Sequence, residues 1–169
     1  MKSLTLAAVL LLVGPYQALA QETASGPRFM PFTFGALGGI SGGGGGSTTL
    51  HFGGGLETVL WKGIGAGAEV GYLAPFPSGF TYGIGTVSLN GLYEPLKPGR
   101  RVTPFVTGGY SLAFREGHGN AINFGGGINY WMRDGLALRV EFRDHMPIYE
   151  SAVENYHLWG MRVGLTWRR

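Results

Sequence analysis

Apolar and polar side chains alternate along much of this chain. Residues 136 to 143 read Leu-Ala-Leu-Arg-Val-Glu-Phe-Arg, so the bulky apolar side chains occupy one set of alternate positions and three charges occupy the other. Residues 159 to 167 read Trp-Gly-Met-Arg-Val-Gly-Leu-Thr-Trp and repeat the pattern. A period of two places successive side chains on opposite faces of a β-strand. The pattern therefore predicts strands with one apolar face and one small or polar face.

Eight segments carry such a pattern, each about as long as the 9 to 11 residues with which a tilted strand crosses a bilayer. They are residues 29–39, 48–61, 64–73, 80–93, 102–114, 121–131, 136–144 and 155–167. Within 80–93 the apolar positions change face, which a β-bulge near Gly83 or Gly85 would explain. Eight is the smallest strand number of bacterial outer-membrane barrels. The chain is thus predicted to be all-β, an eight-stranded antiparallel up-and-down transmembrane β-barrel.

The period of two does not say which face lies inside, because a soluble lipocalin-like barrel has the same period with the opposite polarity. Charged residues make up 14% of the chain, below the roughly 25% of soluble domains, which favours an apolar exterior in lipid. Charges of both signs within the strands are then expected to pair across the lumen: Glu57, Glu69, Arg139, Glu141, Arg143 and Arg162. Tyr and Trp gather at strand ends, as interfacial girdles require: Trp61, Tyr72, Tyr93, Tyr130, Trp131, Trp159 and Trp167.

Residues 1–20 are predicted to be a signal peptide. Lys2 gives a basic start, residues 4–13 are mostly apolar, and Ala18-Leu19-Ala20 fits a small-x-small cleavage site. An apolar run of this length falls short of the roughly 20 residues that a helical span requires. We therefore expect export, a mature chain that begins at Gln21, an N-terminal segment over 21–28 and a barrel domain over 29–169.

The connections between the segments predict the topology. Lys62-Gly63 and residues 132–135 are predicted to be tight turns, and residues 94–101 a longer turn. With both chain ends on the periplasmic side, the other four connections would be short extracellular loops: 40–47, 74–79, 115–120 and 145–154. Within the first of them, the glycine run at 42–46 is expected to be a flexible loop.

Glycine-rich and aromatic motifs recur at residues 53–57, 90–93, 103–109, 123–127 and 138–144. They read GGGLE, NGLY, TPFVTGG, NFGGG and LRVEFRD. Together they resemble the small outer-membrane β-barrel proteins of the OmpA-like transmembrane-domain group, and the resemblance covers residues 29–167. It implies a monomeric barrel in a bacterial outer membrane, in contact with outer-membrane lipid and lipopolysaccharide and inserted by the barrel insertion machinery.

No catalytic or metal-binding set stands out in the sequence. Asp144 and His145 are adjacent, and adjacent strand residues point to opposite faces. No histidine has metal-ligand spacing to another ligand: His51, His118, His145 and His157. We therefore expect no enzymatic activity, no metal and no cofactor. Barrel enzymes that trim lipid A use a Ser-His-acid set, and one alternative rests on residues close in sequence: Ser151, His157 and Glu150 or Glu154.

Six charges in a narrow lumen would have to pair, because an unpaired buried charge costs several kcal/mol. A paired network would plug the barrel, whereas open water channels need about 16 to 18 strands. The basic pairs Arg100-Arg101 and Arg168-Arg169 are too short to indicate a nucleic-acid partner. We expect a structural or membrane-integrity role, with a lipid-modifying barrel enzyme and a soluble secreted lipocalin-like binding barrel as the alternatives.

Overall fold

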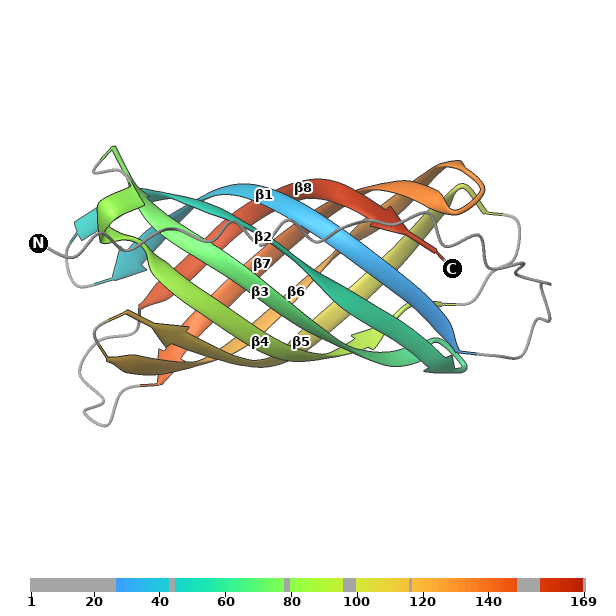
Figure 1. Cartoon of the computed structure of the whole chain (residues 1–169), viewed down its shortest axis with the longest axis horizontal. Helices are drawn as coiled ribbons and strands as arrows, with labels where there is room; N and C mark the ends of the chain where they lie inside the picture. The colour runs from blue at the N-terminus through green and yellow to red at the C-terminus, as the bar shows by residue number, and fades with distance from the viewer. Residues whose placement is uncertain are drawn as a thin grey trace, which may run out of the picture.

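The structure, a computed structural model, describes residues 27–42, 45–77, 80–95, 100–115, 117–148 and 156–168. In these residues eight antiparallel strands close into one barrel, each paired with its neighbours in sequence and β1 paired with β8 (Figure 1). The strands are β1 (Arg28–Gly42), β2 (Gly45–Trp61), β3 (Ile64–Phe76), β4 (Ile84–Tyr93), β5 (Val102–Phe114), β6 (His118–Arg133), β7 (Leu136–Ile148) and β8 (His157–Trp167). The predicted eight-stranded up-and-down barrel is confirmed.

The strands reach farther toward one end of the barrel than the side-chain pattern predicts. Ile40 pairs with Ser47 and Gly42 pairs with Gly45, so most of the predicted loop 40–47 belongs to the β1–β2 hairpin. Within the glycine run predicted to be a flexible loop, Gly42, Gly45 and Gly46 are strand, and residues 43 and 44 lie outside the described residues. Glycine has no side chain to show an alternating pattern, but its backbone N–H and C=O groups still need hydrogen-bond partners, which the ladder supplies.

The segment 80–93 contains a short helix rather than a bulged strand. Residues Phe80–Tyr82 form the 3-10 helix η1, and β4 begins only at Ile84. From Ile84 opposite Leu73 to Tyr93 opposite Ile64, β4 keeps one register against β3. The predicted bulge near Gly83 or Gly85 is thus wrong, because the change of face marks the start of the strand.

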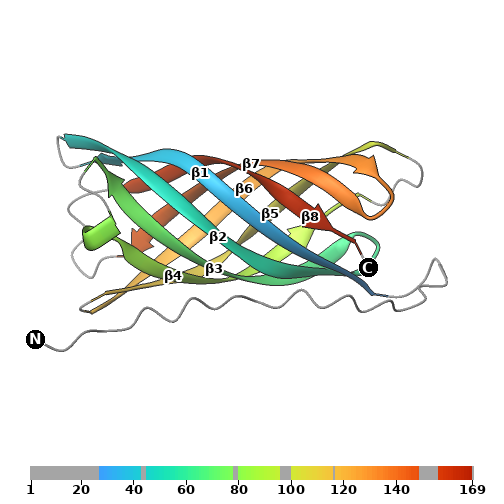
Figure 2. The same cartoon turned by 45° about the horizontal axis from the view of Figure 1, so that its top comes forward.

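Two tight turns define one end of the barrel, which we call the turn end. Lys62 and Gly63 have φ values of 49° and 89°, the left-handed backbone typical of two-residue hairpin turns. Between β6 and β7 the turn is Asp134-Gly135, shorter than the predicted 132–135. The last strand, β8, also ends there (Figure 2). We call the opposite end, with the β1–β2, β3–β4, β5–β6 and β7–β8 connections, the loop end.

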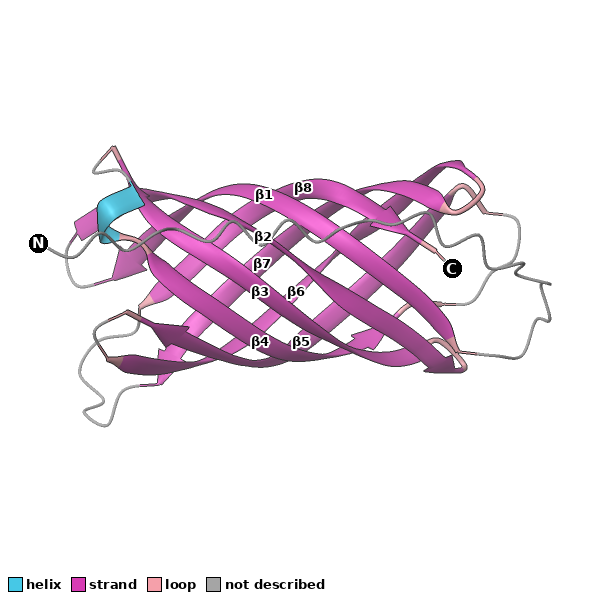
Figure 3. Ribbon diagram, in the orientation of Figure 1, coloured by secondary structure: helices cyan, strands magenta, loops and turns pink. Residues whose placement is uncertain are grey.

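Almost all of the described chain is strand (Figure 3), and the two faces of the wall differ in composition. Side chains on the outer face are bulky and apolar, with exposed fractions of 63% for Leu37, 61% for Val70 and 64% for Leu89. The inner face carries glycines, polar or charged side chains and a smaller number of apolar side chains, and most of these side chains are buried. Among the described residues, no helix is long and apolar enough to cross a membrane.

Candidate functional site

The lumen near the turn end contains a cluster of buried apolar side chains, which we call the apolar plug. Its members are Met30, Val59, Leu92, Phe105, Trp131 and Ala137. Trp131, which the sequence analysis placed in an interfacial girdle, instead lies in the lumen and donates a hydrogen bond from Nε1 to Thr103 Oγ1 at 2.9 Å. Its neighbour Tyr130 faces outward, and adjacent strand residues cannot share a face.

Glu94 lies directly after β4 at the edge of the plug. Asn129 Nδ2 donates a hydrogen bond to its carboxylate at 3.1 Å, and Arg28 lies 3.4 Å from it. Burial nevertheless raises the pKa of the Glu94 carboxyl above its usual value of 4.5, since Arg28 and Asn129 offset only part of the lost hydration. The alternating pattern does not assign this residue to the lumen, because Glu94 follows the last residue of its strand.

The middle of the lumen holds a central network of three arginines and three glutamates. They are Glu57, Glu69, Arg139, Glu141, Arg143 and Arg162, the six charges predicted to face inward, and each is at most 3% exposed. They come from four strands, β2, β3, β7 and β8. With equal numbers of each sign, the network has no net formal charge.

Arg139 donates more hydrogen bonds to the carboxylates of the central network than either of the other arginines. Its Nη1 and Nη2 donate to the two carboxylate oxygens of Glu57 at 2.7 and 2.9 Å, and its Nε donates to Glu141 at 3.0 Å. Such two-pronged contacts between a guanidinium and a carboxylate are directional as well as strong. β7 is thereby connected to β2 across the lumen.

The remaining ion pairs extend the central network toward the loop end. Arg143 donates to Glu141 and lies 3.7 Å from Glu69, and Arg162 Nη1 donates to Glu69 at 3.1 Å. Glu141 and Glu69 are therefore each shared between arginines. Mutual sharing of this kind is what keeps buried charges from being stranded without partners.

Aromatic rings lie against two of the three arginines, Arg139 and Arg162. The Arg139 guanidinium lies 3.9 Å from the Phe105 ring centroid and 4.7 Å from that of Phe32, and Arg162 lies 4.2 Å from Phe34. Contacts between a cation and a ring face are favourable and stronger where water is excluded. The side-chain pattern does not assign these phenylalanines to the lumen, because a bulky apolar residue in a strand also fits the outer face.

Neutral polar side chains fill the lumen beside the central network. Asn123 Nδ2 donates to Asn90 and Ser111, both at 2.9 Å, and the Ser88 and Ser111 hydroxyls are 2.8 Å apart. Arg143 Nη1 donates to Asn123 Oδ1 at 2.6 Å, which joins this cluster to the charges. β4, β5 and β6 thus contribute hydrogen-bonding groups where they contribute no charge.

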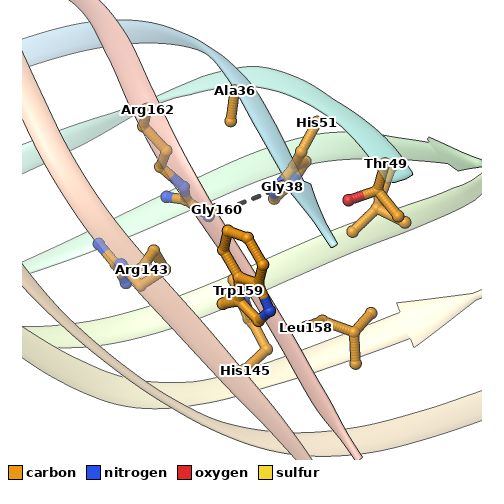
Figure 4. Close-up of a pocket in the computed structure, with 11 residues that line it drawn as sticks. Ala36, Gly38, Thr49, His51, Arg143, His145, Leu158, Trp159, Gly160 and Arg162 are labelled. Atoms are coloured by element: carbon orange, nitrogen blue, oxygen red, sulfur yellow. Dashed lines mark hydrogen bonds between the residues drawn. The ribbon is translucent and has the colours of Figure 1, made fainter. Parts of the chain in front are cut away.

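A small pocket lies between the central network and the loop end (Figure 4). His51, His145, Arg143 and Arg162 line it on the polar side, and His51 lies 3.2 Å from Thr86 Oγ1 and 3.4 Å from Arg162. Its volume of about 10 Å³ is about the least that can hold one water molecule. The two histidines have no acidic or thiol partner in a metal-binding arrangement, and no group of three such ligands exists among the described residues.

Six of the seven predicted interfacial aromatics face outward at the barrel rims. Trp61, Tyr93, Tyr130 and Trp167 lie toward the turn end, and Tyr72 and Trp159 lie toward the loop end. Lys62 lies over the Trp61 ring at 4.4 Å.

One acid and one histidine pair on the outer wall near the loop end. Asp144 Oδ2 and His157 Nδ1 are 2.7 Å apart, joining β7 to β8. Asp144 thus contacts His157 rather than its neighbour His145, which points into the lumen. The other residues of the predicted Ser-His-acid alternative, Ser151, Glu150 and Glu154, lie outside the described residues.

Comparison with known proteins identifies the fold. No protein-family model matches the chain, and no curated protein matches it. Among solved structures, the N-terminal β-barrel domain of Pseudomonas aeruginosa OprF is similar with a TM-score of 0.61 and 14% identity, over 84% of this chain and 97% of that domain. Neisserial surface protein A gives a TM-score of 0.64 and 14% identity, over 86% and 99%. A de novo designed transmembrane β-barrel gives 0.57 and 15%, over 83% and 95%.

At these identities the likeness establishes architecture. The chain has the fold of the small eight-stranded outer-membrane barrels, and the predicted resemblance to the OmpA-like transmembrane-domain group is confirmed at that level.

Proposed function

We propose that the protein is an integral barrel of a bacterial outer membrane with a structural, membrane-integrity role and a lumen closed to solutes. The observation that carries the proposal is the central network, in which three arginines and three glutamates pair across the lumen. Each of these charges is held by a partner of opposite sign, so opening a path would separate buried pairs at a cost of several kcal/mol.

The outer wall supports the placement in a membrane. A soluble monomer rarely exposes a contiguous apolar patch larger than a few hundred Å², whereas here bulky apolar side chains on all eight strands are exposed, among them Leu37, Val70, Leu89 and Val163. A lipocalin-like binder would instead need an apolar cavity inside the barrel. The charged and filled lumen offers little room for a ligand of that kind.

The proposal includes several expectations from the sequence. The chain would be exported after cleavage before Gln21 and inserted as a monomer by the barrel insertion machinery. Its outer wall would contact phospholipid and lipopolysaccharide. The lumen is assigned no catalytic role and no cofactor.

Refolding tests the membrane placement. The chain beginning at Gln21, diluted from urea into detergent micelles, should give a strand-dominated circular dichroism spectrum. It should also migrate faster on a gel when unheated than when boiled, as folded membrane barrels do. A monomeric, folded product in buffer without detergent would overturn the proposal and favour the soluble barrel.

A further inference from the structure

The outer wall carries an acid where lipid contact is expected. Four acidic residues lie within the described strands, and three of them, Glu57, Glu69 and Glu141, point into the lumen. Asp144 shares the outward set of alternate positions with Phe142, which is 43% exposed. Ionisable side chains facing a membrane are costly and usually mark a functional site. Because Asp144 faces outward, its presence cannot be explained by the ion-pair network inside the barrel.

Asp144 orients a histidine on the neighbouring strand. Its Oδ2 lies 2.7 Å from His157 Nδ1, and the Asp144 side chain is 9% exposed whereas that of His157 is 41% exposed. The buried acid thus fixes an imidazole that remains open to the surroundings. The second ring nitrogen of His157, Nε2, has no partner among the described residues.

A serine lies on the other side of the same histidine. In the β1–β8 register Ser41 is directly opposite His157, and it is exposed on the same outward set of positions as Leu37. Residues directly opposite in an antiparallel pair have Cβ atoms about 4.5 to 5.5 Å apart, within reach of a contact between Ser41 Oγ and His157 Nε2. β7, β8 and β1 therefore present acid, imidazole and hydroxyl in spatial order.

We propose that Ser41, His157 and Asp144 form a serine-hydrolase site on the outer wall that cleaves acyl esters of membrane lipids. A hydroxyl, a base and a group that orients the base are the constellation that activates a serine nucleophile, whatever their order in sequence. This activity goes beyond the role of the lumen and rests on the proposed placement in the outer membrane.

The site would act in two covalent steps. Ser41 Oγ attacks the ester carbonyl while His157 Nε2 takes the hydroxyl proton, and the carbon–oxygen bond to the alcohol breaks as His157 returns that proton to the leaving oxygen. Water then attacks the acyl-Ser41 ester with His157 again as base, which releases a fatty acid and restores the serine. Asp144 is a positioning residue, because it acts through the imidazole and not on the substrate.

The position of the site selects the substrate class. Asp144 lies near the loop end of β7, His157 begins β8, and Ser41 is near the end of β1. Trp159, opposite Asp144 in the β7–β8 register and 43% exposed, belongs to the aromatic rim that marks the membrane–water interface in such barrels. At this depth of the outer leaflet lie the ester bonds that join acyl chains to lipid headgroups.

Covalent labelling tests the nucleophile independently of any lipid. The full chain folded in detergent is treated with a serine-directed fluorophosphonate, and labelled peptides are located by mass spectrometry. Ser41 should be modified, and S41A and H157Q should lose the label. S47A, which removes an exposed hydroxyl of β2 near the same rim, should keep it. Heat-modifiable gel migration, recorded for every variant, separates loss of the site from loss of the barrel.

Turnover tests the substrate. The folded protein is reconstituted into phosphatidylethanolamine vesicles and, separately, into vesicles that contain lipopolysaccharide, and released fatty acid is measured. Fatty-acid release from either kind of vesicle that disappears in S41A supports the site. The vesicles from which the fatty acid is released identify the lipid that supplies the ester. Intact acyl chains in both arms, or release that persists in S41A, would overturn the proposal. A correctly migrating barrel with no activity rejects the hydrolase alone, whereas a soluble product rejects the membrane placement.

Asp144→Asn tests the positioning role. The variant should lower kcat by on the order of 10³- to 10⁴-fold, as loss of the orienting acid does in other serine hydrolases, with KM and gel migration unchanged. Equal kcat values for wild type and D144N would show that Asp144 is only structural, and would remove the acid from the proposed site.

Discussion

Glu141 is the residue on which the central network depends most. It accepts hydrogen bonds from Arg139 and Arg143 and lies 3.8 Å from Arg162. Glu141→Gln would keep the shape of the side chain but leave three buried arginines facing two carboxylates. Removal of one partner from a buried pair typically costs about 3–5 kcal/mol. We expect a loss of this order in the free energy of unfolding, measured by urea titration with tryptophan fluorescence in micelles.

Glu94→Gln is the matched control for that experiment. Glu94 is also buried, but its cationic partner Arg28 is partly exposed, with a side-chain exposure of 29%, and can be solvated when the carboxylate is lost. The control should therefore lose much less stability than Glu141→Gln at neutral pH. Equal losses would mean that the central network has no special dependence on charge balance.

The effect of Glu94→Gln on the free energy of unfolding should depend on pH. Because burial raises the pKa of Glu94 in the folded protein, the folded state binds a proton more tightly than the unfolded state does. The stability associated with this group is present below pH 4.5 and is lost as the pH rises through the higher folded pKa. Glu94→Gln removes that loss, so the unfolding free energy of the variant minus that of wild type should increase from acidic to neutral pH. A difference that stays flat across this range would contradict the assignment.

Residue-level inference from the sequence worked where chemistry separates the two faces. The six glutamates and arginines alternate with bulky apolar side chains along their strands, so these charges could be assigned to the lumen by alternation alone. Phe32 and Trp131 could not, because an apolar ring fits the lipid as well as a plugged lumen. The Asp144–His157 contact was also out of reach, since it depends on how two strands are paired.

At the scale of the elements, outward positions should tolerate charge according to their depth in the membrane. Val140 lies in the middle of β7, opposite Ile128 and Val163 on the outer face. Val140→Arg should cost about 2–4 kcal/mol of folding free energy in vesicles, as arginine does at the bilayer midplane. Val102→Arg, at the first position of β5 on the same face, should cost about 0–1 kcal/mol near the interface. Equal costs at the two positions would show that the membrane does not centre on Val140.

Strand existence was predictable and strand length was not. The outline of β5 matched the prediction, since Val102–Phe114 alternates from its first residue to its last. β1 and β2 continue through Gly42 and Gly45, where glycine gives no side-chain signal. Ala137 shows a related limit: alternation places it on the same face as the charges of β7, but there it is fully buried in the apolar plug. Alternation reports which face a side chain is on, and says little about what it meets there.

At the scale of the whole molecule, the lumen contains two layers of buried side chains in series, which we propose act as barriers. The apolar plug lies toward the turn end, and the central network lies between it and the pocket. Arg139 connects them, since it pairs with Glu57 and packs against Phe105 of the plug. On the proposed function, an ion moving through the barrel would have to pass both layers, one held together by apolar packing and the other by mutual ion pairing.

Planar-bilayer recordings test this arrangement. The wild-type barrel should give no steady conductance. Met30→Ala with Phe105→Ala trims the plug but leaves the central network, and Arg139→Ala with Glu57→Ala removes one charge of each sign but leaves the plug. Each double variant should stay closed, because the intact layer still blocks the path, while the fourfold variant should conduct. Steady current through the wild type would show that the lumen is open and would reopen the case for a channel. Steady current through only one double variant would show that the layer trimmed in that variant, and not the pair of layers, closes the barrel.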